Sequence, residues 1–89
     1  MKQSIQMFIF SKNYAAIADR ISKELRRGVT VLDGQGWFSK QNGKILLVIA
    51  KKTDMNFLYK IVKEEDKDAF MSEGSVRGVY GQGFDQIKK

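Results

Sequence analysis

Two glycine-containing segments hold the residue types that could bind a ligand in this chain. The first is Asp33-Gly34-Gln35-Gly36, and Trp37 follows it directly. Because glycine has no side chain, backbone N–H groups here can approach a phosphate or another anion, and Asp33 could accept a hydrogen bond from a ribose hydroxyl. The alternative is structural, since glycines inside a strand often mark a β-bulge that twists the sheet. The segment therefore predicts an anion site or a bulge.

The second segment, residues 78–84, is near the end of the chain and contains Gly81, Gly83 and Phe84. Too few residues follow it to form a helix, so it is not the dinucleotide fingerprint, which joins a strand to a helix. We expect this tail either to fold against the Asp33 segment and close a pocket, or to dock the C-terminus through Phe84. The candidate ligand-binding residues are Asp33, Gly34, Gly36, Trp37, Gly81, Gly83 and Phe84.

Trp37 and Phe38 are adjacent aromatic residues. If they continue a strand, they point to opposite faces of the sheet, one toward the core and one outward. An outward aromatic ring could stack on a base or fill a subunit interface.

The composition excludes several kinds of chemistry. The 89-residue chain has no cysteine and no histidine, which removes disulfides, thiolate and histidine metal sites, and Ser-His-Asp catalysis. Gly43-Lys44 is not a P-loop, because a strand follows where a helix is required. We therefore predict a non-enzymatic protein with no catalytic residue, metal or cofactor. The net charge of +6 favours anionic partners.

The elements that must position these residues follow from hydrophobic periodicity. Three strands are predicted in chain order: residues 5–10, residues 29 to about 40, which are bent at the glycines, and residues 44–52. Asn42-Gly43 favours a tight type I′ hairpin turn between the last two. An apolar stripe from Tyr14 to Leu25 predicts a helix whose last turn contains Arg26 and Arg27, with Gly28 as the C′ residue after its end. A second helix spans 55 to about 66, and a fourth strand begins at 69 and ends near 74.

This β-α-β-β-α-β order predicts one α+β domain over residues 1–89, with a ferredoxin-like four-stranded antiparallel sheet and both helices on one face. The unbroken apolar run 45–50 indicates a central strand or one buried on both faces. From the first strand, either Ile5, Met7 and Ile9 or Phe8 and Phe10 face the helices. The expected core partners are Ile17, Ile21, Leu25, Leu46, Val48, Leu58 and Ile61.

Several stretches together resemble one known family. They are Gly28-Val-Thr-Val-Leu-Asp-Gly-Gln-Gly-Trp-Phe, Lys44-Ile-Leu-Leu-Val-Ile-Ala, Ile61-Val-Lys-Glu, Asp68-Ala-Phe and Gly78-Val-Tyr-Gly-Gln-Gly-Phe84. The chain is similar to the soluble C-terminal domain, of unknown function, of YitT-type bacterial membrane proteins. That family resembles the PII signalling proteins, ferredoxin-like units that form trimers and bind adenine nucleotides between subunits. The resemblance implies a domain excised from a larger protein, with the parent's membrane region as partner.

The resemblance also implies a place at the cytoplasmic face of the bacterial plasma membrane and a homo-oligomer, with a trimer favoured. One departure from the family is Glu64-Glu65-Asp66-Lys67, where an apolar residue and then Asp-Pro are usual. Glu65 falls on the expected apolar stripe, so the second helix should end early or pack loosely there.

Three function classes follow. The first is a ligand-sensing or assembly domain that binds a small anion such as a nucleotide. The alternative is an RNA-binding ferredoxin-like module, but its stacking platform is half missing, because residues 45–49 are wholly aliphatic. Nucleic acid is therefore disfavoured as a partner. An acylphosphatase-like hydrolase is also disfavoured, because no arginine precedes Arg20.

Overall fold

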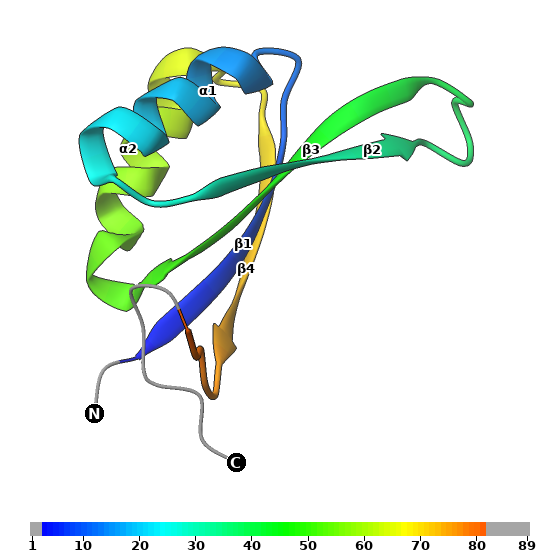
Figure 1. Ribbon diagram of the computed structural model, residues 1–89. Coiled ribbons are helices and arrows are strands. Elements are labelled where there is room, and N and C mark those ends of the chain that lie inside the picture. Colours follow the sequence, from blue (N-terminus) through cyan, green and yellow to red (C-terminus); the bar gives the residue numbers. More distant parts are fainter. Residues whose placement is uncertain (1–2, 82–89) are drawn as a thin grey trace.

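The computed structural model describes residues 3–81, which form an antiparallel sheet with helices packed on one face (Figure 1). The elements in chain order are β1 Ser4–Phe10, α1 Tyr14–Arg20, η1 Ile21–Leu25, β2 Val29–Gln35, β3 Asn42–Lys51, η2 Lys52–Asp54, α2 Met55–Glu65 and β4 Phe70–Val76. The strand order is β2-β3-β1-β4, and each neighbouring pair is antiparallel. The predicted ferredoxin-like arrangement, with β1 and β3 in the centre, is confirmed.

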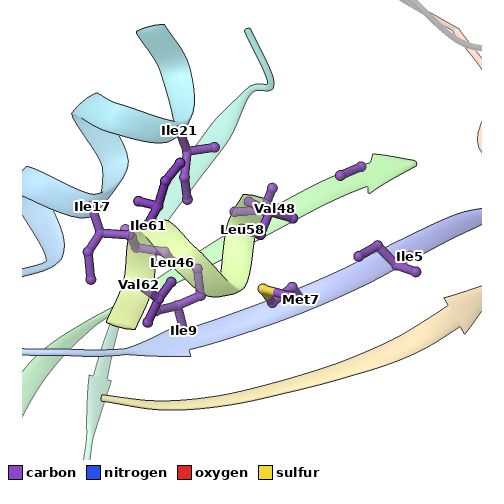
Figure 2. Packing of buried hydrophobic residues seen from close by; sticks show 11 residues of the cluster. Ile5, Met7, Ile9, Ile17, Ile21, Leu46, Val48, Leu58, Ile61 and Val62 are labelled. Carbon is purple, nitrogen blue, oxygen red and sulfur yellow. The ribbon is translucent and has the colours of Figure 1, made fainter. Parts of the chain in front are cut away.

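The core lies between the sheet and the helices, and it resolves the choice left open for β1. Ile5, Met7 and Ile9 are buried against the helices (Figure 2). Phe8 and Phe10 belong to the opposite face of the strand. Strand alternation requires this split, because successive side chains leave a strand on opposite sides. The fully assembled cluster is Ile5, Met7, Ile9, Ile17, Ile21, Leu46, Val48, Ala50, Leu58, Ile61 and Val62.

The first helix begins at Tyr14 as expected, but its last turns widen into the π-helix η1. The predicted apolar stripe still faces the core, since Ile17 and Ile21 are fully buried and Leu25 packs against the core from its edge. The helix was expected to include Arg26 and Arg27 and to end with Gly28 in the C′ position, which is commonly left-handed, but η1 ends at Leu25. The left-handed residue is Arg26, whose φ is 55° and ψ 37°.

The hairpin differs most from expectation. β2 ends at Gln35 instead of continuing to about residue 40, and the loop covers 36–41. Asn42 and Gly43 are strand residues that pair with Gln35 and Gly34, so the predicted Asn-Gly turn is wrong. The Gly36 N–H donates to the Gln41 carbonyl oxygen at 3.0 Å, and the Lys40 N–H donates to the Gly36 carbonyl oxygen at 2.8 Å.

β3 is central but is covered on one face only within the described chain. Leu46, Val48 and Ala50 are buried, and the residues between them are half-buried. The helix-free face of the sheet is therefore apolar. It carries Phe8, Phe10, Leu32, Ile45, Leu47, Ile49, Phe70 and Val76, with the Phe10 and Phe70 ring centroids 5.3 Å apart.

α2 ends at Glu65, close to the expected boundary. The Glu65 carboxylate that interrupts the apolar stripe is accommodated by Arg20 of α1, at 3.2 Å. Arg20 also bonds Glu64 at 2.9 Å and Glu24 at 2.7 Å. One guanidinium therefore ties the end of α2 to the first helix, and these carboxylates raise the pKa of Arg20.

Candidate ligand-binding site

The outer half of the β2–β3 hairpin extends beyond the rest of the sheet (Figure 1). β1 ends at Phe10, which pairs with Ile45, so within residues 3–81 no strand lies on the β1 side of β3 from Lys44 toward the loop. Backbone N–H groups on an unpaired strand edge point outward. This edge could therefore offer hydrogen-bond donors to a ligand.

Two glycines face each other on this ribbon. Gly34 pairs directly with Gly43 in a register that runs without interruption from Val29 to Gln35, so the alternative prediction of a β-bulge is wrong. Both glycines belong to the helix-free face, where the Ile45 side chain covers Gly34 and only Gly43 leaves open space. A Cβ atom on Gly43 would meet nothing within 4 Å, and one on Gly34 would lie 2.7 Å from Cδ1 of Ile45.

A hollow lies on each side of the ribbon at this point. The helix-side hollow has a volume of about 770 Å³ and is lined by Lys12, Tyr14, Asp33, Gly34, Gln35, Asn42, Gly43 and Lys44. The second has a volume of about 390 Å³ and adds the apolar side chains of Phe10 and Ile45. Lys12, Lys44 and both paired glycines line both volumes. We call the two together the hairpin hollow.

The connection between β1 and α1 forms the opposite wall of the hairpin hollow. It is fastened to the end of α2 by two hydrogen bonds: the Ser11 hydroxyl donates to the Asp66 carboxylate at 2.6 Å, and the Asn13 side-chain amide donates to the Glu65 carbonyl oxygen at 2.7 Å. The Ser11 hydroxyl and the Asp68 N–H lower the pKa of Asp66, because both stabilise its charged form. Lys12 is thus presented by an anchored loop.

The charges of the hollow are two lysines and one carboxylate. The Lys44 ammonium donates to the carboxylate of Asp33, its cross-strand partner, and this hydrogen bond raises the pKa of Lys44. Asp33 is 85% exposed, so the pair is open to solvent and to ligands. Lys12 is exposed as well, and it adds a second positive charge.

The structure brings only some of the predicted site residues together. Asp33 and Gly34 line the larger hollow and Gly36 lines the smaller one. Trp37 and Phe38 belong to the loop and not to a strand, so they do not alternate across the sheet as predicted. Gly83 and Phe84 lie outside the described residues.

Gly81 is the one predicted residue of the second segment that the structure describes, and it lies apart from the Asp33 segment. It follows β4, whose last residue Val76 pairs with Ser4 at the start of β1. The Asp33 segment lies past the other end of β1 and on the opposite edge of the sheet. A pocket that contained both Gly81 and the Asp33 segment would therefore require two subunits.

Sequence reasoning missed Lys12, Tyr14, Gly43 and Lys44 as site residues. Gly43 was assigned to a turn because Asn-Gly is a strong hairpin signal. Lys12 carries no motif; only the topology, which returns the β1–α1 connection to the β3 edge, shows that it lies here.

Comparison with known proteins gives a consistent family match. The family described as "Uncharacterized protein conserved in bacteria (DUF2179)" matches residues 27–81. The UPF0750 membrane protein YxkD of Bacillus subtilis (strain 168) is 37% identical over 81 residues, which are 91% of this chain and 29% of that protein. The UPF0750 membrane protein YitT of the same organism is 27% identical over 73 residues, or 82% of this chain and 26% of that protein. The chain thus spans less than a third of these relatives.

Solved structures agree in fold. The DUF2179 protein from Eubacterium ventriosum aligns with a TM-score of 0.72 and 30% identity, covering 81% of this chain and 99% of that one. A functionally unknown protein from Pediococcus pentosaceus ATCC 25745 also gives a TM-score of 0.72, but at 10% identity, so it supports the fold alone. Among residues 3–81, no helix has the length and apolar character needed to cross a membrane.

Proposed function

We propose that this chain, which belongs to the DUF2179 family of bacterial proteins, is a regulatory domain of a larger membrane protein and binds a small anionic ligand. A nucleotide is the candidate that the site favours. The observation that carries the proposal is the hairpin hollow, which Lys12 and Lys44 line and where Gly43 leaves open space on the helix-free side. The names of the relatives support the membrane context, because this chain corresponds to only 29% of YxkD.

The chemistry of the hollow fits a ligand with one charged and one flat apolar part. Lys12 and Lys44 would attract a phosphate, assisted by outward N–H groups of β3. Phe10 and Ile45, on the other side of the ribbon, would contact a base where Gly43 leaves room. A volume of about 770 Å³ lies within the usual range for small-molecule sites, roughly 300–1,000 Å³.

Binding would proceed without turnover. The sequence contains no histidine or cysteine, and the carboxylate of the hollow, Asp33, is held by Lys44. Asp33 would keep Lys44 in place and could accept a hydrogen bond from a sugar hydroxyl. We place the domain at the cytoplasmic face of the plasma membrane, in keeping with a chain that has no cysteine to oxidise.

We expect the domain to form a homo-oligomer, with the trimer of PII-like proteins as the favoured form. The reason is the apolar helix-free face, because large exposed apolar surfaces are usually covered by another subunit. Such assembly could also bring the segment after β4 of one subunit to the hairpin of another. Light scattering across a range of protein concentrations should give a mass above that of the monomer. A clean monomer at high concentration would contradict self-association of this chain.

Ligand binding should be measurable by calorimetric titration with a panel of mono-, di- and cyclic nucleotides on the assembled protein. A ligand at a hundred times its dissociation constant would also stabilise the fold by about 2.7 kcal/mol. Lys12→Gln should weaken binding, because it removes one charge of the hollow, whereas Lys60→Gln on the exposed surface of α2 should not. If none of the nucleotides binds the oligomer, the sensing proposal fails.

RNA binding is the second candidate, and one observation favours it. Phe8 and Phe10 both lie on the helix-free face of the central strand β1, where RNA-binding ferredoxin-like domains place stacking aromatics. The neighbouring residues of β3, Ile45, Leu47 and Ile49, are aliphatic, so the platform would be incomplete. A single-stranded RNA oligomer in the same titration separates the two candidates.

A further inference from the structure

The tip of the β2–β3 hairpin exposes two aromatic side chains that neither the fold nor the hairpin hollow uses. Trp37 is 83% exposed and Phe38 is fully exposed, at 101%. The ammonium of Lys40 lies 3.0 Å from the centre of the Trp37 ring. Aromatic residues at such exposure gain nothing from burial in the folded chain, so they indicate a surface that is covered by something else.

The tip is a defined structure. Besides the two backbone hydrogen bonds that close the loop, the Gln35 side-chain amide donates to the Lys40 carbonyl oxygen at 3.1 Å, and the Gln41 N–H donates to the Ser39 hydroxyl at 3.2 Å. The loop therefore presents its two aromatic rings in a formed turn, which lowers the conformational cost of binding.

The charge around the tip has one sign. The tip residues 36–41 contain no acidic residue and one lysine, Lys40, and the next charged residue along β3 is Lys44. Asp33, at the base of the ribbon, is paired with Lys44. Exposed aromatics beside a lysine, without a carboxylate at the tip, complement a surface that is anionic outside and apolar beneath.

We propose that the hairpin tip, residues 36–41, inserts Trp37 and Phe38 into the headgroup region of an anionic lipid membrane, with Lys40 at the lipid phosphates. Tryptophan suits this depth, because its ring is apolar and its N–H is polar. The inference rests on the proposed attachment to a membrane protein, since a tethered domain needs only a weak contact to stay on the bilayer.

The size of the tip favours a membrane over a second copy of the chain. Two aromatic side chains bury about 150–250 Å² each, whereas a stable protein interface takes about 800 Å² from each partner. The tip alone does not reach that area. The apolar face of the sheet is a separate surface, and self-association there would leave the hairpin tip accessible.

Trp37 is the one tryptophan of the sequence, so the tryptophan fluorescence of the protein reports on the hairpin tip. Vesicles containing equal amounts of phosphatidylglycerol and phosphatidylcholine should shift the Trp37 emission to shorter wavelength and sediment the protein. Vesicles of phosphatidylcholine alone should do so much less, and added salt should weaken the binding because it screens Lys40. Phe38→Ser should reduce partitioning roughly tenfold, since one buried aromatic ring is lost.

Phe57→Ser is the matched control, because it removes an exposed aromatic from α2, away from the hairpin (Figure 1). It should partition like the parent chain, and circular dichroism would establish that both variants fold. The Phe38→Ser variant should retain nucleotide binding, so membrane contact and ligand binding can fail separately. No emission shift with anionic vesicles would overturn the proposal. So would a shift that follows protein concentration without lipid, which would indicate self-association through the tip.

Discussion

Replacing Leu46 by alanine is expected to lower the free energy of unfolding by about 2–5 kcal/mol, the usual cost of removing a large buried side chain. Leu46 is fully buried at the centre of β3, where it pairs with Ile9 of β1 and Val31 of β2. Ile21→Ala should cost a similar amount on the helix side of the core. Because domains of this size have only about 5–15 kcal/mol in total, urea denaturation should show either loss clearly.

Leu47→Ala is the matched control for Leu46→Ala. It is the next residue of the same strand, but it points to the helix-free face and is only half-buried. Its loss should therefore be smaller in the monomer, and a larger effect on the oligomer would report that this face is covered by a subunit. Losses below about 0.5 kcal/mol for both Leu46→Ala and Ile21→Ala would contradict the core described here.

The order of elements could be predicted because short apolar runs indicate strands and apolar stripes indicate helices. Which face of each strand the helices cover could not be predicted. In β1 the helix-facing residues Ile5, Met7 and Ile9 alternate with Phe8 and Phe10, which are also apolar. The run 45–50 in β3 gives the same difficulty, since both of its faces are apolar although the described chain covers only one. Hydrophobic patterning indicates which residues avoid water, and it does not distinguish the helices from another covering surface.

The hairpin was mispredicted because the Asn-Gly turn preference is local, whereas the hairpin follows the pairing register of the whole of β2 with β3. A two-residue turn at Asn42-Gly43 would set Gln35 opposite Ala50 and Ser39 opposite Leu46, on the covered face of the sheet. The observed register instead brings Val29 opposite Val48 and Val31 opposite Leu46. The pairing register of β2 is the one that places its apolar residues on the covered face of the sheet, because burying polar side chains there would cost free energy. The six-residue loop and the exposed aromatic tip are consequences of that choice.

The candidate site was predicted in part for the same reason. Asp33 and Gly34 could be recognised from the sequence because glycines within a strand are unusual. Their partners Gly43 and Lys44 come from the observed register, and Lys12 comes from the end of β1. Neither contribution is encoded in a local motif. The predicted role of Gly36 also changes: a Cβ atom there would lie 2.6 Å from the Ser39 hydroxyl oxygen, so Gly36→Val would disturb the turn rather than test the site.

Gly43→Val is expected to remove ligand binding at the hairpin hollow while the fold remains intact. Gly43 lies in a regular strand without a positive φ, and an added Cβ atom meets nothing within 4 Å. Valine favours strands and would not reduce the stability of the ribbon. Its two methyl groups would occupy the space beside Phe10 and Ile45 that the proposed ligand needs. Calorimetric titration with the nucleotide that binds the parent chain should then show no measurable heat of binding, and thermal unfolding should show an unchanged or higher midpoint.

Gly74→Val is the control that separates blocking of the site from a general effect of valine. Gly74 is also an exposed strand glycine with nothing within 4 Å of an added Cβ atom, but it lies in β4, at the opposite edge of the sheet from β2. This variant should bind ligand like the parent chain. If Gly43→Val folds and binds with unchanged affinity, the ligand does not occupy the glycine side of the hollow. If Gly74→Val alone loses binding, the site belongs instead to the β1–β4 side of the sheet, where Gln6, Phe8 and Val76 line a smaller hollow of about 280 Å³.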